Sequence, residues 1–358
     1  MLSEEEKTTM LEITATITGI SYKHILQFNL NTYSASDLAK AIENSAFRLV
    51  WDDKVVFTVS RWVSPKRTRS YPYVNVYKTL SYNDGKRVTI IPVVKDEGFA
   101  GDRDFIQWDT ISMMSLLGVY VILAYYNDAS ISMKDNKITN QKFDLEYINQ
   151  QLSLLNDYKS DALHWNLDQA SSINQIMERA QQSYVSISKR LDVKLHSDKQ
   201  LSQRISAFYQ NIKEFKEMSR VQAQSAQLRE IATIQPKENV NQGLKATIII
   251  TNYLKGIYYL TVDEASIDHN RVLLIEAKHT KGVGLPSIND ILDGVLKLIL
   301  YCNLSMVVVN DKEYIPKPVL KLTSSEPINV NGLTKERKEF LKMLLQEAEE
   351  NGFKVDIV

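Results

Sequence analysis

Asp263, Glu276 and Lys278 have the residue types and the spacing for metal-assisted hydrolysis. Glu276 and Lys278 stand two positions apart at the end of the apolar run Val272–Ile275. Residues i and i+2 of a strand project from the same face, so both side chains are predicted to leave one face of a buried strand. Asp263 precedes them across a turn at Asp268–Asn270, and an antiparallel hairpin carries it back towards Glu276. The sequence therefore predicts two carboxylates and one ammonium group at a single point.

Two carboxylates beside a lysine suit a magnesium site that acts on a phosphate. Carboxylate oxygens and water are ligands that Mg²⁺ accepts while it still binds phosphate, and the ion activates water and stabilises the leaving oxygen. Lys278 is expected to orient or deprotonate that water. The alternative for any Glu-x-Lys on a strand is a surface ion pair. Here the pair ends a buried run and follows an acidic residue at hairpin distance, which favours the metal site.

These residues resemble the PD-(D/E)xK nuclease superfamily, whose core is a strand–strand–strand–helix–strand unit. In that resemblance Asp263 is the first acidic residue and Glu276 the second, both as metal ligands, and Lys278 is the catalytic lysine. Val262 stands where the name of the superfamily has proline, which is a departure from the pattern.

Residues 275–300 look most like type II restriction endonucleases, and the resemblance covers about residues 245–310. It implies Mg²⁺-dependent hydrolysis of DNA phosphodiester bonds at a specific duplex sequence. In many members a further acidic residue completes the metal site, and Glu217 and Glu230 are the candidates here. The implied partners are double-stranded DNA and a second copy of the chain, because two-fold symmetric sites favour homodimers. A DNA methyltransferase of the same system is a further implied partner.

Cations in two other segments are candidates for DNA contacts. The densest basic segment begins at Arg61 and contains Lys66, Arg67 and Arg69, with aromatic residues and prolines between them. Such a strip can neutralise phosphates and place guanidinium groups against guanine edges, and an ordinary basic loop is the alternative. Lys281, just after the predicted strand, is a candidate phosphate contact, with a solvated face as the alternative.

A second group of charges lies beside an apolar run in the N-terminal part of the sequence. It consists of Lys95, Asp96, Asp102 and Asp104. Acidic residues are favoured at the start of a helix by the helix dipole, so their presence has a structural explanation. A rival metal site and a recognition element stay open as alternatives.

The composition and periodicity of the sequence change twice along the chain, which predicts three domains and an α/β (α+β) fold. Residues 1–142 mix strand and helix patterns and are interpreted as an α/β domain for DNA recognition. Residues 143–235 read as a block of long helices, serving for dimerisation or as an arm that embraces DNA. Residues 236–358 are expected to form a restriction-endonuclease-like mixed sheet flanked by helices, which is the nuclease domain.

Individual elements follow from periodicity and from capping residues. Strands are predicted at Val55–Val59, from Asn75 and at Val119–Tyr125, and a helix is predicted at Phe105–Leu117. Another helix is predicted to start at Ser287, with Asp290 as its capping partner. Spacings of three and four define two helical faces, which consist of Ile173, Ile176, Ala180, Tyr184 and Ile187, and of Leu201, Ile205, Phe208, Ile212 and Phe215.

Composition bounds these expectations. The 358 residues contain 43 Lys and Arg against 43 Asp and Glu, which excludes a uniformly basic coat but permits a local basic cleft. Cys302 is the single cysteine, so a disulfide scaffold and a cysteine-based zinc site are excluded, and a cytoplasmic location is expected. No signal peptide or apolar membrane span is visible in the sequence. The alternatives are a nuclease of another defence or mobile-element system, and a non-catalytic DNA-binding protein with a degenerate nuclease core.

Overall fold

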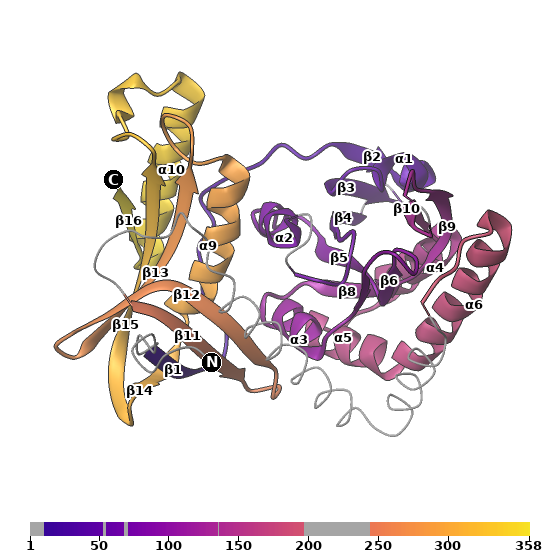
Figure 1. The fold of residues 1–358 in the computed structure, drawn as a ribbon, viewed down its shortest axis with the longest axis horizontal. Coiled ribbons are helices and arrows are strands. Elements are labelled where there is room, and N and C mark those ends of the chain that lie inside the picture. The colour runs from indigo at the N-terminus through magenta and orange to yellow at the C-terminus, as the bar shows by residue number, and fades with distance from the viewer. Residues whose placement is uncertain (1–10, 53–54, 68–70, 135, 197–243) are drawn as a thin grey trace. The chain divides into compact units, whose positions relative to one another are not determined.

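The computed structural model describes residues 11–52, 55–67, 71–134, 136–196 and 244–358 (Figure 1). These residues form two compact units. The split unit consists of residues 11–27 and 244–358, and the inserted unit consists of residues 28–196 apart from the gaps just given. Both units combine strands with helices, so the predicted mixed α/β class is confirmed.

The split unit is built on one mixed sheet. Its strands are β1 (Leu11–Ile17), β11 (Leu244–Asn252), β12 (Ile257–Asp268), β13 (Arg271–Thr280), β14 (Ser305–Val309), β15 (Lys312–Ser324) and β16 (Lys354–Ile357). Within the described residues their order is β13-β12-β11-β1-β14-β15-β16, and β15 also pairs with β13, so the sheet curls back on itself. Strands β11, β12 and β13 form an antiparallel meander, and β15 runs parallel to β13.

Two α-helices accompany this sheet among the described residues. Helix α9 (Ile288–Cys302) packs against β13 and β15 and is buried along most of its length (Figure 1). It begins where the sequence predicts, because the Ser287 hydroxyl accepts a hydrogen bond from the Asp290 backbone N–H at 3.1 Å. Helix α10 (Lys335–Asn351) ends at Gly352, which has a φ of +74° and occupies the left-handed position that glycine favours.

Strand β15 is a central strand for which the sequence analysis makes no prediction. Pro316 and Pro318 argue against a central strand because proline cannot donate to a β-ladder. The Ile315 N–H donates to the Asn270 carbonyl on the β13 side at 2.9 Å, so N–H groups at even positions face the other side. On that side β16 pairs only from Val319 onwards. Both prolines therefore occupy positions where no ladder donor is needed.

The inserted unit contains a five-stranded sheet, two small hairpins and six α-helices among its described residues. The sheet has the order β2 (Thr32–Ser34), β3 (Ala46–Trp51), β4 (Val55–Arg61), β5 (Lys86–Pro92) and β8 (Tyr120–Ala124). The hairpins pair β6 (Val94–Asp96) with β7 (Arg103–Phe105), and β9 (Tyr126–Ile131) with β10 (Ile138–Phe143). The helices are α1 (Leu38–Ala41), α2 (Pro72–Leu80), α3 (Trp108–Leu116), α4 (Leu145–Asp157), α5 (Ala162–Ser171) and α6 (Ile173–Leu191).

The predicted elements of the inserted unit are confirmed except for one. Strands β4 and β8 and helix α3 lie where the sequence indicates them. The strand predicted from Asn75 is wrong, because these residues belong to helix α2. Pro72 stands in the first turn of that helix, where its fixed φ suits a helix. All residues of α2 except Lys78 are buried, so an alternating or helical pattern of apolar residues is not visible there.

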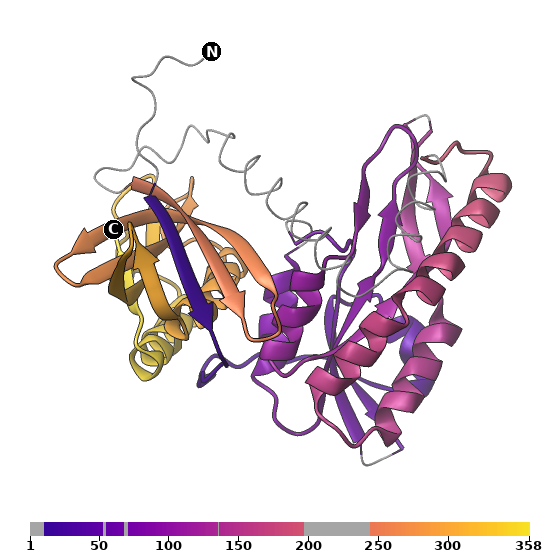
Figure 2. The ribbon, with the colours of Figure 1, turned by 90° about the horizontal axis from the view of Figure 1, so that it is seen from below.

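The described residues do not divide at 142, and the division predicted at 235 lies outside them. Residues 11–27 belong with the C-terminal part of the chain, because β1 pairs in parallel with β11 from Leu11–Ala246 to Ile17–Asn252. Helices α4, α5 and α6 do not form a separate block, since α4 and α5 pack on β8 and α6 packs on β9. Figure 2 shows α6, in pink, running along the strands of the inserted unit.

The helical face predicted from Ile173 to Ile187 is confirmed. These residues are buried on α6 together with Met177. The second predicted face, Leu201 to Phe215, lies outside the described residues, as does the remainder of the predicted helical block up to residue 235. No helix in the described ranges is long and apolar enough to cross a membrane.

A buried carboxylate fastens the segment after β1 to helix α10. Glu347 has no exposed surface, and its two oxygens accept hydrogen bonds from Tyr22 Oη at 2.9 Å, Ile25 N at 2.8 Å and Leu26 N at 2.7 Å. Asn351, one turn later, accepts from Lys23 N at 2.7 Å and donates to its carbonyl at 2.8 Å. Hydrogen bonds therefore attach the segment after β1 to the C-terminal half of helix α10.

Replacing this carboxylate tests how much the attachment contributes. The substitution Glu347→Ala leaves two backbone N–H groups and one hydroxyl without their acceptor, so it is expected to lower the free energy of unfolding by about 3 kcal/mol. Chemical denaturation followed by circular dichroism measures this change. Glu349→Ala removes an exposed carboxylate from the same helix and serves as the control. Equal stability of the two variants would contradict the assignment.

Candidate functional site

The β12–β13 hairpin brings Asp263 to Glu276, as the sequence predicts. The two strands pair from Asp268–Arg271 to Glu264–Ile275, and one position further Asp263 lies opposite Glu276. There the Asp263 Oδ2 atom accepts a hydrogen bond from the Ala277 backbone N–H at 2.8 Å. Lys278 projects from the same face as Glu276, and its Nζ lies 2.9 Å from Glu276 Oε1. The three predicted residues thus converge.

Helix α9 adds two charged side chains to this point. Lys297 Nζ lies 3.0 Å from Glu276 Oε1 and 3.0 Å from Oε2. Asp293 Oδ2, one turn earlier on the helix, lies 3.0 Å from Lys278 Nζ. The site therefore consists of three carboxylates and two ammonium groups. The sequence analysis did not assign Asp293 or Lys297 to the site, although polar residues at i and i+4 on an otherwise apolar helix were a signal for them.

Gly294 allows the helix to lie close to the strand. A Cβ atom at this position would lie 3.0 Å from Lys278 Cε, 3.1 Å from Leu320 Cδ1 and 3.2 Å from Glu276 Cγ. These distances are shorter than ordinary van der Waals contacts, so a larger residue would move the helix or the charged side chains. The glycine is explained by close approach and not by an unusual backbone angle.

Burial and charge together fix the electrostatics of the site. Glu276 is 1% exposed, and burial alone would raise its pKa, but Lys297 and Lys278 hold the pKa below its ordinary value. Burial alone would lower the pKa values of Lys278 and Lys297, and the negative charge of Glu276 raises both instead. Glu276 is therefore ionised and both lysines are protonated at neutral pH.

Asp263 behaves differently from Glu276. Burial and the neighbouring charge of Glu276 raise the pKa of Asp263 to about 7, against the opposing effect of the two lysines. A carboxyl group in this position is poised between the neutral and the charged form at physiological pH. A cation bound between Asp263 and Glu276 would remove their repulsion, so this pair fits a divalent ion.

Two of the carboxylates of the site, Asp263 and Glu276, are available to such an ion, and water would fill its remaining coordination positions. Within the described residues no group of three or more His, Cys, Asp and Glu side chains gathers in a way that could hold a metal ion. Asp263 and Glu276 nonetheless match the donor set of Mg²⁺, which keeps several waters and takes one or two carboxylates. The predicted further ligands Glu217 and Glu230 lie outside the described residues.

The opposite face of the same strands carries an ion pair of its own. Lys321 Nζ on β15 lies 2.8 Å from Glu264 Oε2 on β12, and the two side chains are 16% and 18% exposed. His279 also lies away from the site, since its Nδ1 contacts Thr323 Oγ1 at 2.9 Å. Because side chains alternate between the two faces of β12 and β13, the candidate site and the Lys321–Glu264 ion pair lie on opposite faces of the sheet. The lysines of the two ion pairs are exposed to a similar degree.

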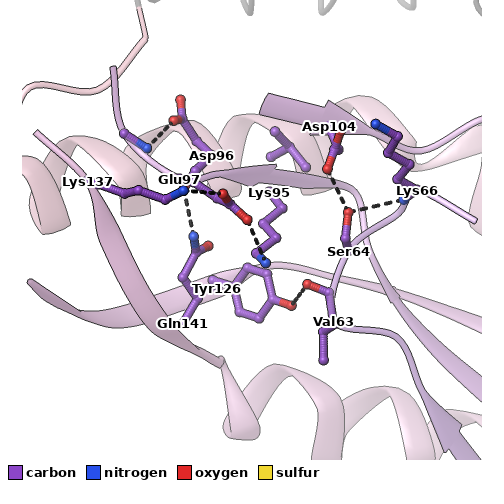
Figure 3. A network of polar contacts seen from close by, with 12 residues as sticks. Val63, Ser64, Lys66, Lys95, Asp96, Glu97, Asp104, Tyr126, Lys137 and Gln141 are labelled. Carbon is purple, nitrogen blue, oxygen red and sulfur yellow. Dashed lines mark hydrogen bonds and ion pairs between the residues drawn. The ribbon is translucent and has the colours of Figure 1, made fainter. Parts of the chain in front are cut away.

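The second predicted group of charges takes part in several contacts, and within it Lys95 and Asp104 are cross-strand partners in the β6–β7 hairpin. Lys95 and Lys137 lie on either side of Glu97, each at 3.1 Å (Figure 3). Asp104 accepts a hydrogen bond from Ser64 Oγ at 2.9 Å (Figure 3), and Asp102 is exposed. The carboxylates in this group thus have separate surroundings, which does not favour a shared metal site.

Asp96, the remaining member of that group, is buried within its own network. It is 1% exposed, and its carboxylate contacts His196 Nδ1 at 2.9 Å, Gly98 N at 2.9 Å and Arg103 Nε at 3.3 Å. The backbone N–H of Asp96 donates to the Tyr184 hydroxyl at 3.0 Å. These contacts join the β6–β7 hairpin to α6, so a structural role explains Asp96.

The cations predicted to contact DNA are in different environments. Arg61 ends β4, and its Nε donates to the Asn44 carbonyl at 3.5 Å. Arg67 lies 3.6 Å from the buried carboxylate of Asp109, with its own side chain 14% exposed. Lys66 is half-buried and Lys281 is exposed, and Arg69 lies outside the described residues. Among the four cations of this set that the structure describes, Lys281 is the one that solvent reaches most freely.

Comparison of the chain with protein-family models, with curated proteins and with solved structures gives no match. The geometry of the site is therefore the basis for a proposed function.

The raised pKa of Asp263 predicts a pH-dependent stability in the absence of metal. A carboxyl group whose pKa rises from 3.8 to about 7 on folding contributes stability below its unfolded pKa. That contribution is lost as the pH rises through 7. Asp263→Asn keeps an acceptor for Ala277 but cannot ionise, so it should be more stable than the wild type at pH 8.5, by about 2 kcal/mol.

Thermal unfolding in the presence of a chelator between pH 4 and 8.5 measures this difference. We expect the advantage of Asp263→Asn to shrink towards pH 4, where the wild-type carboxyl is neutral. A constant difference across the range would show that Asp263 does not change its ionisation on folding.

Proposed function

We propose that the protein is a Mg²⁺-dependent endodeoxyribonuclease of the type II restriction kind, which cuts duplex DNA at a specific sequence. The observation that carries the proposal is the convergence of Asp263, Glu276 and Lys278 at one edge of a buried hairpin. Two neighbouring carboxylates can hold a divalent ion that activates water and stabilises the leaving oxygen, and a lysine beside them can offset charge on the phosphate. The residues resemble the PD-(D/E)xK motif in type and in order along the chain.

Each residue has a role that its surroundings support. Asp263 and Glu276 would hold Mg²⁺, which polarises the phosphoryl group and lowers the pKa of bound water. Lys278 is protonated, because Glu276 raises its pKa. Its ammonium group is therefore suited to orient the attacking water and to offset charge on the scissile phosphate. Direct deprotonation of water by Lys278 would first require loss of its proton, which its ion pairs oppose.

The proposal includes a duplex DNA substrate and a homodimer. Lys281 follows the catalytic strand within three residues of Lys278 and is exposed, so it can neutralise a phosphate next to the one being cut. A zero net charge limits non-specific attraction to the DNA backbone, which leaves more of the discrimination to base contacts. A homodimer would present two such sites to a two-fold symmetric sequence. A cytoplasmic location and a cognate methyltransferase belong to the same proposal.

Incubation of the purified chain with plasmid and linear DNA tests the proposal directly. Discrete fragments of constant length that appear with Mg²⁺ and disappear with a chelator are the expected result. Cleavage that needs a further protein would favour a nuclease of another defence or mobile-element system. Tight DNA binding without any cleavage would favour the non-catalytic alternative.

Lys278→Ala should abolish Mg²⁺-dependent cleavage and leave DNA binding nearly unchanged. Loss of one catalytic lysine is expected to lower the cleavage rate by at least about 100-fold, because the water and the phosphate lose their positioning cation. Glu276 keeps Lys297 as its partner in this variant, so the buried charge is not left uncompensated.

Lys321→Ala is the matched control for this substitution. The Lys321 side chain is 16% exposed against 17% for Lys278, and it forms an ion pair of similar length on the opposite face of the sheet. A loss of stability that comes from removing such a lysine should therefore appear in both variants. Cleavage rates, mobility shifts and unfolding temperatures are compared for the two. Retained cleavage in Lys278→Ala would remove this site from consideration and direct attention to Lys95, Asp102 and Asp104.

A further inference from the structure

Lys297 makes the most extensive contact with the central carboxylate of the site. Its ammonium group lies 3.0 Å from each oxygen of Glu276. Lys278 Nζ lies 2.9 Å from Oε1 of the same carboxylate. Lys297 comes from a helix whose other residues facing the protein interior are apolar, and it is 17% exposed. A cation in such surroundings requires a fixed anionic partner, and Glu276 is that partner.

Asp293 makes the complementary contact with the other strand residue. Its Oδ2 lies 3.0 Å from Lys278 Nζ. Asp293 and Lys297 are four residues apart, so they lie on the same face of α9. Asp293 of the helix thus pairs with Lys278 of β13, and Lys297 of the helix pairs with Glu276 of β13. Gly294 lies between them, where a side chain would meet both Lys278 and Glu276.

We infer that Lys297 and Asp293 are positioning residues of the site, with Lys297 fixing the Glu276 carboxylate for a divalent cation and Asp293 fixing Lys278. The inference rests on the proposed function, and it adds two residues that do not belong to the Asp-Glu-x-Lys pattern. Two strand residues would otherwise be free to change rotamer at the edge of the hairpin. With the helix in place, each is held from two sides.

The acceptor capacity of Glu276 leaves room for a cation beside Lys297. A carboxylate offers about four lone-pair positions, and two ammonium groups lie within 3.0 Å of this one. Two lysines do not use up its acceptor capacity, so Glu276 can still accept a metal ion. Lys297 then lies close to the ion as a like charge, so it orients the ligand and at the same time weakens the binding of the ion.

This double role predicts opposite effects on metal binding and on cleavage. Lys297→Met keeps the length and the apolar stem of the side chain and removes its charge. Loss of a neighbouring positive charge should tighten the binding of Mn²⁺ about tenfold. Loss of the fixed Glu276 position should slow DNA cleavage roughly 100-fold. A purely structural role would weaken both properties together.

Three proteins are compared: the wild type, Lys297→Met and the matched control Lys321→Met. Calorimetric titration with Mn²⁺ alone gives the affinity, and a plasmid assay at saturating Mn²⁺ gives the rate. We expect Lys321→Met to match the wild type in both. If Lys297→Met is folded and shows weaker Mn²⁺ binding, or an unchanged cleavage rate, the inference is overturned.

A second measurement separates failure of this inference from failure of the proposed function. Wild-type protein that neither binds Mn²⁺ nor cuts DNA overturns the proposed function. Unfolding of Glu276→Gln, Lys297→Met and the double variant in a chelator tests the positioning contact without any metal or DNA. If Lys297 and Glu276 stabilise each other, the double variant should lose less free energy of unfolding than the sum of the losses in the two single variants. Simple addition of the losses would overturn the inference even in an active enzyme.

Discussion

The burial of one negative charge, that of Glu276, determines the arrangement of the split unit around it. A carboxylate that is 1% exposed is unfavourable unless cations and hydrogen bonds compensate it. Lys278 comes from the same strand and lies 2.9 Å from one of its oxygens. The second cation, Lys297, comes from α9, and α9 must lie close to the strand for Lys297 to contact both oxygens. Gly294 makes that distance possible, so the glycine and the second lysine are consequences of the same constraint.

The rest of the split unit holds α9 and the hairpin in this relation. Strand β15 lies parallel to β13 and supplies Leu320 beneath Gly294. The N-terminus of α10 is tied to the loop before α9, since Arg337 donates to the Leu285 carbonyl at 2.7 Å. At its other end, α10 accepts the segment after β1 through Glu347. The site is thus supported by elements from both ends of the chain, and its precision depends on contacts far from the charged residues.

The sequence was sufficient to predict the hairpin, because alternation along a strand and a polar turn fix which side chains share a face. It was also sufficient for helix α9 and its cap at Ser287, and for the apolar face of α6. It did not reveal which face of α9 meets β13, since that helix is apolar nearly all round and several registers satisfy its periodicity. Asp293 and Lys297 could therefore not be assigned to the site from the sequence.

Strand β15 could not be predicted because it contains Pro316 and Pro318. Prolines fit a central strand only where the neighbouring strand begins after them, and the start of that neighbour depends on the whole sheet. The domain division failed for a similar reason, because the pairing of β1 with β11 is a long-range contact.

The position of β1 has a consequence for the order of events during synthesis. Leu11 pairs with Ala246, and Ile13 on the other side pairs with Val309, so β1 is an interior strand of the sheet whose neighbours leave the ribosome long after it does. The inserted unit has its own core and can fold in the interval, since domains generally fold as units during translation. The sheet of the split unit, by contrast, cannot pair β1 on both sides until residues 305–309 have been made. A chain arrested before α9 would carry the Asp263–Glu276 hairpin without Asp293 and Lys297, so the arrangement of charges at the site arises only after that helix has been made.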